Sequence, residues 1–199
     1  ADLHTPVRLF LALRGAGHRA CLLESAEGPE RLARYSFLGV DPIGSFRAAH
    51  DGAVFEGQDG REEFDGDGLS ALRKLAERYH QPAPPRGLPP FCGGWVGGFT
   101  YEWAGVLEPS TGMPRTTLAE NPYARFHLFE TVVACDHATQ KLILITACRA
   151  GAAGHEQAMQ TLDKRAETLG GEPAELPAFR LLDEEPRPSM SREQYEAGV

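Results

Sequence analysis

The sequence predicts an α+β fold with largely antiparallel sheets and helices packed on the outside. Strand-like segments follow one another through hairpin turns, and helical segments are interspersed among them, which is typical of this class. The two strongest turn signals are Asp51-Gly52 and Asp59-Gly60, each between alternating residues. They predict a meander of three strands over 45–50, 53–58 and 61–64.

The N-terminal segment predicts a short helix and two strands. Thr5 followed by Pro6 is typical of an N-cap with proline at the first helical position, and Gly15 lies where the helix is expected to end. Apolar runs then predict strands over 19–25 and 34–40, joined by a polar segment that contains glycine and proline.

The middle of the chain predicts a helix, a connector and a glycine-rich strand. Asp67 is expected to cap the second helix, whose apolar residues repeat at three- and four-residue spacing, and the proline-rich segment 81–90 is expected to be extended. GGWVGG at 93–98 resembles a phosphate-binding loop, but FTYEW at 99–103 is strand-like and a phosphate loop must open a helix. The glycines therefore predict close approach of another backbone.

The last third predicts a hairpin of strands 126–135 and 141–148 and a third helix over about 154–169. The residues expected to face inward on that helix are Met159, Leu162, Ala166 and Leu169. We expect one domain over 1–171, a linker over 172–190, and the start of a helix belonging to a further, catalytic domain over 191–199. That helix is marked by a capping box from Ser191 to Gln194.

Composition narrows the possible functions. The chain has 199 residues, 28 acidic against 20 basic side chains and a net charge of −8, which disfavours nucleic acid and anionic membranes as partners. We find no signal peptide and no apolar run of about 18 residues, so we expect a soluble, cytoplasmic protein. The cysteines have no paired spacing and the histidines no zinc spacing, so we expect free thiols and no metal site. The cysteines are Cys21, Cys92, Cys135 and Cys148.

Two neighbouring predicted strands each bring polar groups to an apolar sheet. Glu24 and Ser25 end the first strand, and Arg34, Tyr35 and Ser36 begin the second. A carboxylate, hydroxyls, a phenol and a guanidinium at one pocket edge suit a zwitterionic amino acid. The alternative is structural, because a Glu24–Arg34 ion pair would tie the two strands together.

Other polar residues favour structural roles. Asp136-His137 could be an acid that orients a base, but a tight hairpin turn explains both residues. The charged runs at 61–63 and 183–185 are typical of solvated faces.

Several separated motifs in order resemble one family. LLESAEGPERLARYSFLGVDP is similar to the N-terminal signature of the large subunit of anthranilate synthase, component I. The likeness extends to DLHTPVRLF before it and to PPFCGGWVGGFTYE, ETVVACDH and SREQYEAGV after it. The resemblance implies the fold of the N-terminal half of component I. It also implies an enzyme that converts chorismate to anthranilate with magnesium and with ammonia from a glutamine amidotransferase subunit, component II.

By the same resemblance, the catalytic and magnesium-binding residues belong to the C-terminal half, so this chain is expected to hold neither and to be inactive alone. It is expected to carry most of the tryptophan feedback site, with Glu24 and Ser25 central and Arg34, Tyr35 and Ser36 as a further wall. Some members have a lysine near the last three positions, and this chain has none there.

A Pro-Tyr pair that contacts tryptophan in the family lies in its catalytic half, so Asn121-Pro122-Tyr123 is not expected to replace it. Two alternatives remain open. The large subunit of para-aminobenzoate synthase shares the fold and the substrate, and the polypeptide could instead act alone as an amino-acid-binding or interaction module.

Overall fold

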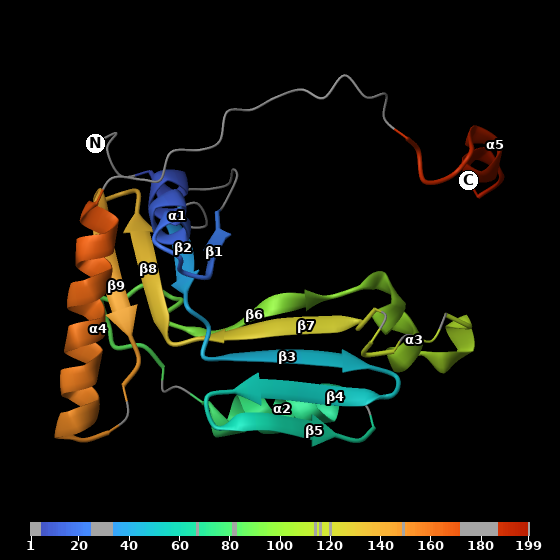
Figure 1. The fold of residues 1–199 in the computed structure, drawn as a ribbon, viewed down its shortest axis with the longest axis horizontal. Coiled ribbons are helices and arrows are strands. Elements are labelled where there is room, and N and C mark those ends of the chain that lie inside the picture. Colours follow the sequence, from blue (N-terminus) through green and yellow to red (C-terminus); the bar gives the residue numbers. More distant parts are fainter. Residues whose placement is uncertain are drawn as a thin grey trace.

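Two antiparallel sheets carry the fold in the computed structural model, which describes residues 5–24, 34–66, 68–80, 83–113, 115, 117–119, 121–148, 150–171 and 187–198 (Figure 1). One has four strands in the order β1-β2-β8-β9, and the other has five in the order β5-β4-β3-β7-β6. Every neighbouring pair is antiparallel, and this confirms the predicted fold class. The strands are β1 (Ala20–Leu23), β2 (Tyr35–Val40), β3 (Gly44–Ala49), β4 (Gly52–Gly57), β5 (Gly60–Phe64), β6 (Gly94–Phe99), β7 (Ala124–Phe129), β8 (Thr131–Asp136) and β9 (Lys141–Thr146).

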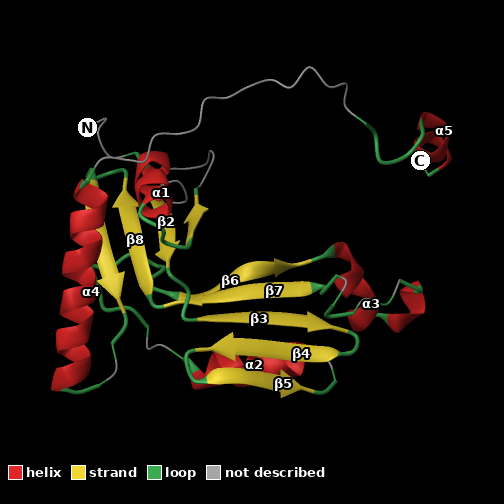
Figure 2. Cartoon of the chain, viewed as in Figure 1, coloured by secondary structure: helices red, strands yellow, loops and turns green. Residues whose placement is uncertain are grey.

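The three longer helices pack on the outside of the sheets (Figure 2). The α-helices are α1 (Pro6–Gly15), α2 (Gly68–Arg78), α3 (Ala104–Leu107), α4 (Ala152–Gly170) and α5 (Arg192–Ala197). The Thr5 side chain accepts a hydrogen bond from the backbone N–H of Arg8, which confirms the predicted cap of α1. No helix in the parts of the chain that the structure describes is long and apolar enough to cross a membrane.

Each sheet has its own apolar core. Helices α1 and α4 cover the four-stranded sheet, where Leu13, Leu38 and Val133 are fully buried. Helix α2 packs on the five-stranded sheet through Leu75, which lies beside Phe46 and others in the second core. Both Asp-Gly turns join the strands that they were predicted to join, β3 to β4 and β4 to β5.

The glycines of β6 allow the backbone of β7 to approach closely. A Cβ atom built on Gly97 would lie 2.0 Å from the carbonyl oxygen of Arg125, so only glycine fits. This confirms the structural interpretation of GGWVGG. The strand prediction for 99–103 holds for Phe99 alone and is wrong beyond it, because β6 ends at Phe99 and a 3₁₀ turn covers Tyr101–Trp103. Stacking of the Phe99 and Trp103 rings, with centroids 4.5 Å apart, accompanies this turn.

The predicted single strand over 126–135 is two strands in different sheets. β7 lies beside β3 and β6, whereas β8 lies beside β2 and β9. The antiparallel pairs β3–β7 and β2–β8 form one ribbon that bends between the sheets (Figure 1). Between the pairs Val40↔Thr131 and Gly44↔Leu128, the three residues 41–43 lie opposite the two residues 129–130. Such a mismatch bends a strand.

Helix α4 turns a different face inward from the one predicted. Leu169 is buried as expected, but Met159 is 45% exposed and Ala166 is exposed. Arg165 instead points inward, with 16% of its side chain exposed. Pattern counting treats arginine as an outward residue, and here an ion pair with Asp41 compensates its burial.

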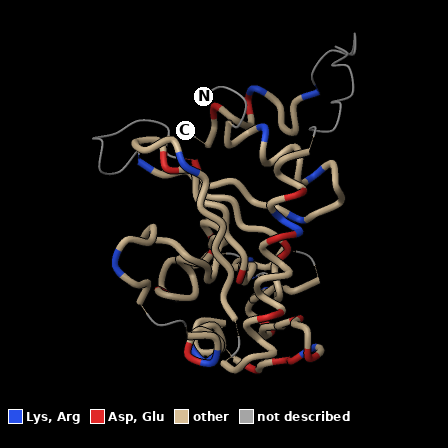
Figure 3. Tube along the Cα trace, turned by 90° about the vertical axis from the view of Figure 1, so that its left-hand side faces the viewer, with Lys and Arg blue, Asp and Glu red and all other residues tan. Residues whose placement is uncertain are grey.

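Surface charges are interspersed along the described chain (Figure 3). On the five-stranded sheet, Arg61 forms ion pairs with Glu63 and Glu56, at 2.8 and 3.7 Å. The side chains of Arg61 and Glu63 are more than half exposed, which confirms the predicted solvated face of 61–63. The second predicted charged run, 183–185, and the predicted cap Asp67 lie outside the described residues.

The C-terminal helix α5 begins with the predicted capping box. The Ser191 hydroxyl accepts from the backbone N–H of Gln194, and the Gln194 side chain accepts from the backbone N–H of Ser191. Most of the predicted linker, residues 172–186, lies outside the described residues.

Candidate functional site

The candidate site lies where β1 ends and β2 begins. The two strands pair as predicted, in a register that places Leu23 opposite Phe37. Glu24 follows directly after β1 and is exposed. Ser25 lies outside the described residues. The other neighbour of β2 is β8, which brings the end of β8 and the following turn to the same edge.

Arg34 forms its ion pair with Asp136 and not with Glu24. The Arg34 Nε and Nη2 atoms donate to the two carboxylate oxygens of Asp136, at 3.1 and 2.7 Å. The predicted Glu24–Arg34 pair is therefore wrong. The physical reason is burial, since the Asp136 side chain is 4% exposed and a buried carboxylate must be paired.

Asp136 also organises the hairpin between β8 and β9. Its Oδ1 atom accepts from the backbone N–H groups of Ala138 and Thr139, at 3.0 and 3.2 Å, which confirms the turn interpretation. The bond from Arg34, followed by the bonds at Thr139, holds the pKa of Asp136 well below its usual range. Asp136 is thus a permanent negative charge neutralised by Arg34.

His137, for which the sequence favoured only a turn role, contributes to the site. Its Nε2 atom lies 2.8 Å from the Oγ atom of Ser36, and its backbone N–H donates to the carbonyl of Arg34 at 2.9 Å. Ser36 is 1% exposed, so its hydroxyl needs this partner. Only the pairing of β2 with β8 places His137 beside Ser36, and no local feature of the sequence signals this contact.

The predicted site residues lie on two faces of the sheet. Ser36 and its cross-strand neighbour Cys135 belong to the helix-covered face, because Cys135 packs with the core that α1 and α4 cover. Tyr35 points to the opposite face, where its ring stacks on Phe37 and lies 4.9 Å from the guanidinium carbon of Arg34.

Glu24 lies near enough to the buried thiol of Cys135 to act on it electrostatically. Burial, and after it the negative charge of Glu24, raise the pKa of Cys135 to about 11. The structure therefore brings together Glu24, Ser36, Cys135 and His137 at one edge of the sheet, and places Tyr35 and Arg34 beside them on the other face.

Alkaline pH should destabilise the protein through Cys135. A thiol with a raised pKa stays protonated in the folded state, whereas in the unfolded state it loses its proton above its ordinary pKa of 9.0, so stability falls as pH rises from there to about 11. Urea unfolding at pH 8 and pH 10.5 should show that the wild type loses about 2 kcal/mol more than Cys135→Ala. Equal losses in the two proteins would exclude a perturbed thiol.

Known proteins resemble this chain along most of its length. The profile of the chorismate binding enzyme family matches residues 18–199. Anthranilate synthase component 1 of Pseudomonas aeruginosa is 31% identical, covering 100% of this chain and 42% of that protein. The component 1 of Neisseria gonorrhoeae is 37% identical over 61% of this chain and 25% of its own length. This chain thus spans less than half the length of these relatives.

A solved structure has the same fold. Anthranilate synthase component I from Streptococcus pneumoniae superposes with a TM-score of 0.57 and 23% identity, covering 99% of this chain and 42% of that one. At this identity the likeness is one of fold.

Proposed function

Because the chain belongs to the chorismate binding enzyme family, we propose that it is the N-terminal part of an anthranilate synthase component I and carries its tryptophan feedback site. The whole enzyme would make anthranilate from chorismate. The observation that carries the proposal is the family match over 18–199, together with an exposed carboxylate, Glu24, at the end of the half-buried strand β1. The relatives named component 1 support the choice of reaction.

The charges at the site favour an amino acid as the ligand. Arg34 and Asp136 neutralise each other, so among the described residues of the site Glu24 is the carboxylate that can attract an ammonium group. Ser25 would supply a hydroxyl, Ser36 would be held in place by His137, and the half-buried ring of Tyr35 would form an apolar wall. Feedback then requires that tryptophan bind the inactive arrangement of the enzyme more tightly than the active one.

The chemistry is assigned to residues outside this chain. Among the described residues, no group of three or more His, Cys, Asp or Glu side chains could hold a metal ion, so these residues do not fit a magnesium site. Magnesium would be bound by the catalytic domain, of which α5 would be the first helix. Residues 172–190 would connect that domain to residues 1–171. Ammonia would come from a glutamine amidotransferase subunit, component II.

The proposal is tested by assaying the full-length protein for fluorescent anthranilate from chorismate, magnesium and ammonium, with and without tryptophan. We expect product that falls when tryptophan is added, and no product from the 199-residue chain used as a control. Para-aminobenzoate precursor in place of anthranilate would reassign the reaction, and turnover by the short chain would refute the division of labour.

A further inference from the structure

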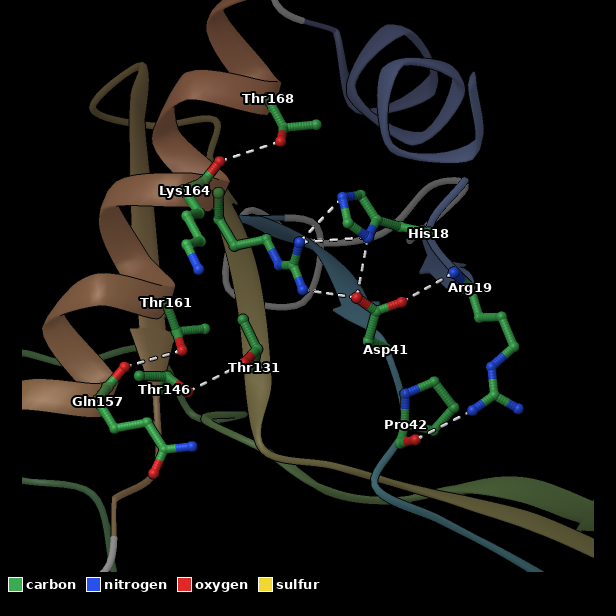
Figure 4. Close-up of polar contacts among 11 residues, drawn as sticks. His18, Arg19, Asp41, Pro42, Thr131, Thr146, Gln157, Thr161, Lys164 and Thr168 are labelled. Atoms are coloured by element: carbon green, nitrogen blue, oxygen red, sulfur yellow. Dashed lines mark hydrogen bonds and ion pairs between the residues drawn. The ribbon is translucent and has the colours of Figure 1, made fainter. Parts of the chain in front are cut away.

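A polar cluster ties three distant segments together at the bend between the two sheets (Figure 4). The Arg165 Nη2 atom of α4 donates to Asp41 Oδ2 at 2.5 Å, and its Nη1 atom lies 2.9 Å from His18 Nε2. His18 Nδ1 lies 2.9 Å from the same oxygen of Asp41. We define Arg165, Asp41 and His18 as the bend cluster.

The hydrogen bonds of the bend cluster form a closed set. Arginine can only donate, so His18 Nε2 accepts from Arg165 and His18 Nδ1–H donates to Asp41. The second oxygen of Asp41 accepts from the backbone N–H of Arg19 at 3.0 Å. Each partner therefore fixes the orientation of the other two, as in a network whose members support one another.

Asp41 occupies the residue where the chain leaves one sheet for the other. It follows β2 directly, and β3 begins three residues later at Gly44. Its backbone φ is +46°, in the left-handed region that aspartate tolerates better than most residues. Backbone bonds hold the bend on both sides, from Asp41 N–H to the carbonyl of Arg19 and from Ile43 N–H to that of Leu128.

Burial indicates that Arg165 is more than a surface contact. Its side chain is 16% exposed, and its Nε atom is buried without a hydrogen-bond partner among the described residues. An unsatisfied buried N–H costs free energy, so this Nε atom lowers the stability of the folded state. The rest of the guanidinium holds Asp41 and His18 in place at the bend.

The bend cluster and the candidate site lie at opposite ends of the paired strands β1 and β2. The β1–β2 pairing runs from Ala20↔Val40, beside the cluster, to Leu23↔Phe37, beside Glu24. The first and last of these four paired residues lie about 10 Å apart along the strand. The bend cluster thus holds the end of this strand pair that lies opposite the candidate site.

The geometry points to Arg165 as a positioning residue that couples ligand binding at Glu24 to the packing of the two sheets. This inference rests on the proposed function. With the bend cluster intact, tryptophan at the site displaces the paired strands β1 and β2 together with the bend, and the inactive arrangement is favoured. Without the bend cluster, tryptophan still binds, but the bend moves independently, and the affinities of the two arrangements for tryptophan differ less.

The test uses the full-length enzyme with the variants Arg165→Met, Arg165→Lys and Asp41→Asn. Asparagine is chosen at position 41 because it tolerates the left-handed backbone there. Lys164→Met on the exposed face of the same helix is the matched control. Turnover without tryptophan, the concentration of tryptophan for half-inhibition, and amide hydrogen exchange over residues 19–23 and 41–44 are measured.

We expect Arg165→Met and Asp41→Asn to raise the half-inhibiting concentration about tenfold, with turnover without tryptophan within about twofold of wild type. Amide exchange at the bend should quicken, Arg165→Lys should lie between, and Lys164→Met should match wild type. Half-inhibition unchanged in Arg165→Met and Asp41→Asn overturns the inference while leaving the proposed function standing. A wild-type enzyme that makes anthranilate and ignores tryptophan overturns the feedback proposal and this inference together.

Discussion

Replacing Gly97 by alanine is expected to lower the free energy of unfolding by about 3 kcal/mol or more. The new Cβ would lie 2.0 Å from the carbonyl oxygen of Arg125 and 2.6 Å from the Cα atom of Phe126. Both are backbone atoms of β7, which cannot rotate away as a side chain can. Strand β6 would have to separate from β7 and lose part of its ladder of hydrogen bonds.

Gly98 provides the matched control for this prediction. It lies in the same strand, and a Cβ built there has open space within 4 Å. Alanine at this position should be neutral or stabilise slightly, by at most about 1 kcal/mol, because it restricts the unfolded chain. Urea unfolding of the two variants separates the effects, and similar losses in both would mean that strand propensity, not the approach of β7, decides.

Glu24→Gln is expected to raise the tryptophan concentration for half-inhibition of the full-length enzyme by about 10- to 100-fold. Hydrogen bonds that involve a charged group contribute about 1.5–3 kcal/mol, and each 1.4 kcal/mol is a factor of ten. Ser25→Ala would remove the neutral hydrogen bond proposed between Ser25 and tryptophan, worth about 0.5–1.5 kcal/mol, and should raise this concentration by about 2- to 10-fold. Anthranilate formation at increasing tryptophan measures both values.

Asp59→Asn is the control for this experiment, because it removes an exposed carboxylate in the β4–β5 turn on the other sheet. Turnover without tryptophan reports whether each variant is folded. Wild-type sensitivity in Glu24→Gln would remove Glu24 from the effector site and favour a purely structural role for the end of β1.

Local signals predicted the elements that local chemistry forms. The Asp51-Gly52 and Asp59-Gly60 turns and the Thr5 cap need only neighbouring residues, and all three are confirmed. The split of 126–135 at Glu130 could not be predicted, because one short polar interruption in an apolar segment does not tell a single long strand from two strands in different sheets. The bend arises from unequal numbers of residues on two strands that lie far apart in the sequence.

The candidate site was predictable only where it depends on residues that are close in the sequence. Pairing of β1 with β2 follows from the short connection between them, and it brings Glu24 towards Ser36. Asp136 and His137 lie about a hundred residues from their partners, Arg34 and Ser36. Only the pairing of β2 with β8 brings them there, and a single sequence carries no signal for a sheet order. The tryptophan-binding role of the site remains a prediction.

The bent ribbon has a consequence for how the protein folds. The two pairs of strands that run through both sheets join residues 44–48 to 124–128 and 35–40 to 131–136. These contacts have high contact order, because some eighty to one hundred residues must be brought together before they form. Neither sheet can be completed until β7 and β8 have been synthesised, so the two sheets should fold slowly and as a single cooperative unit.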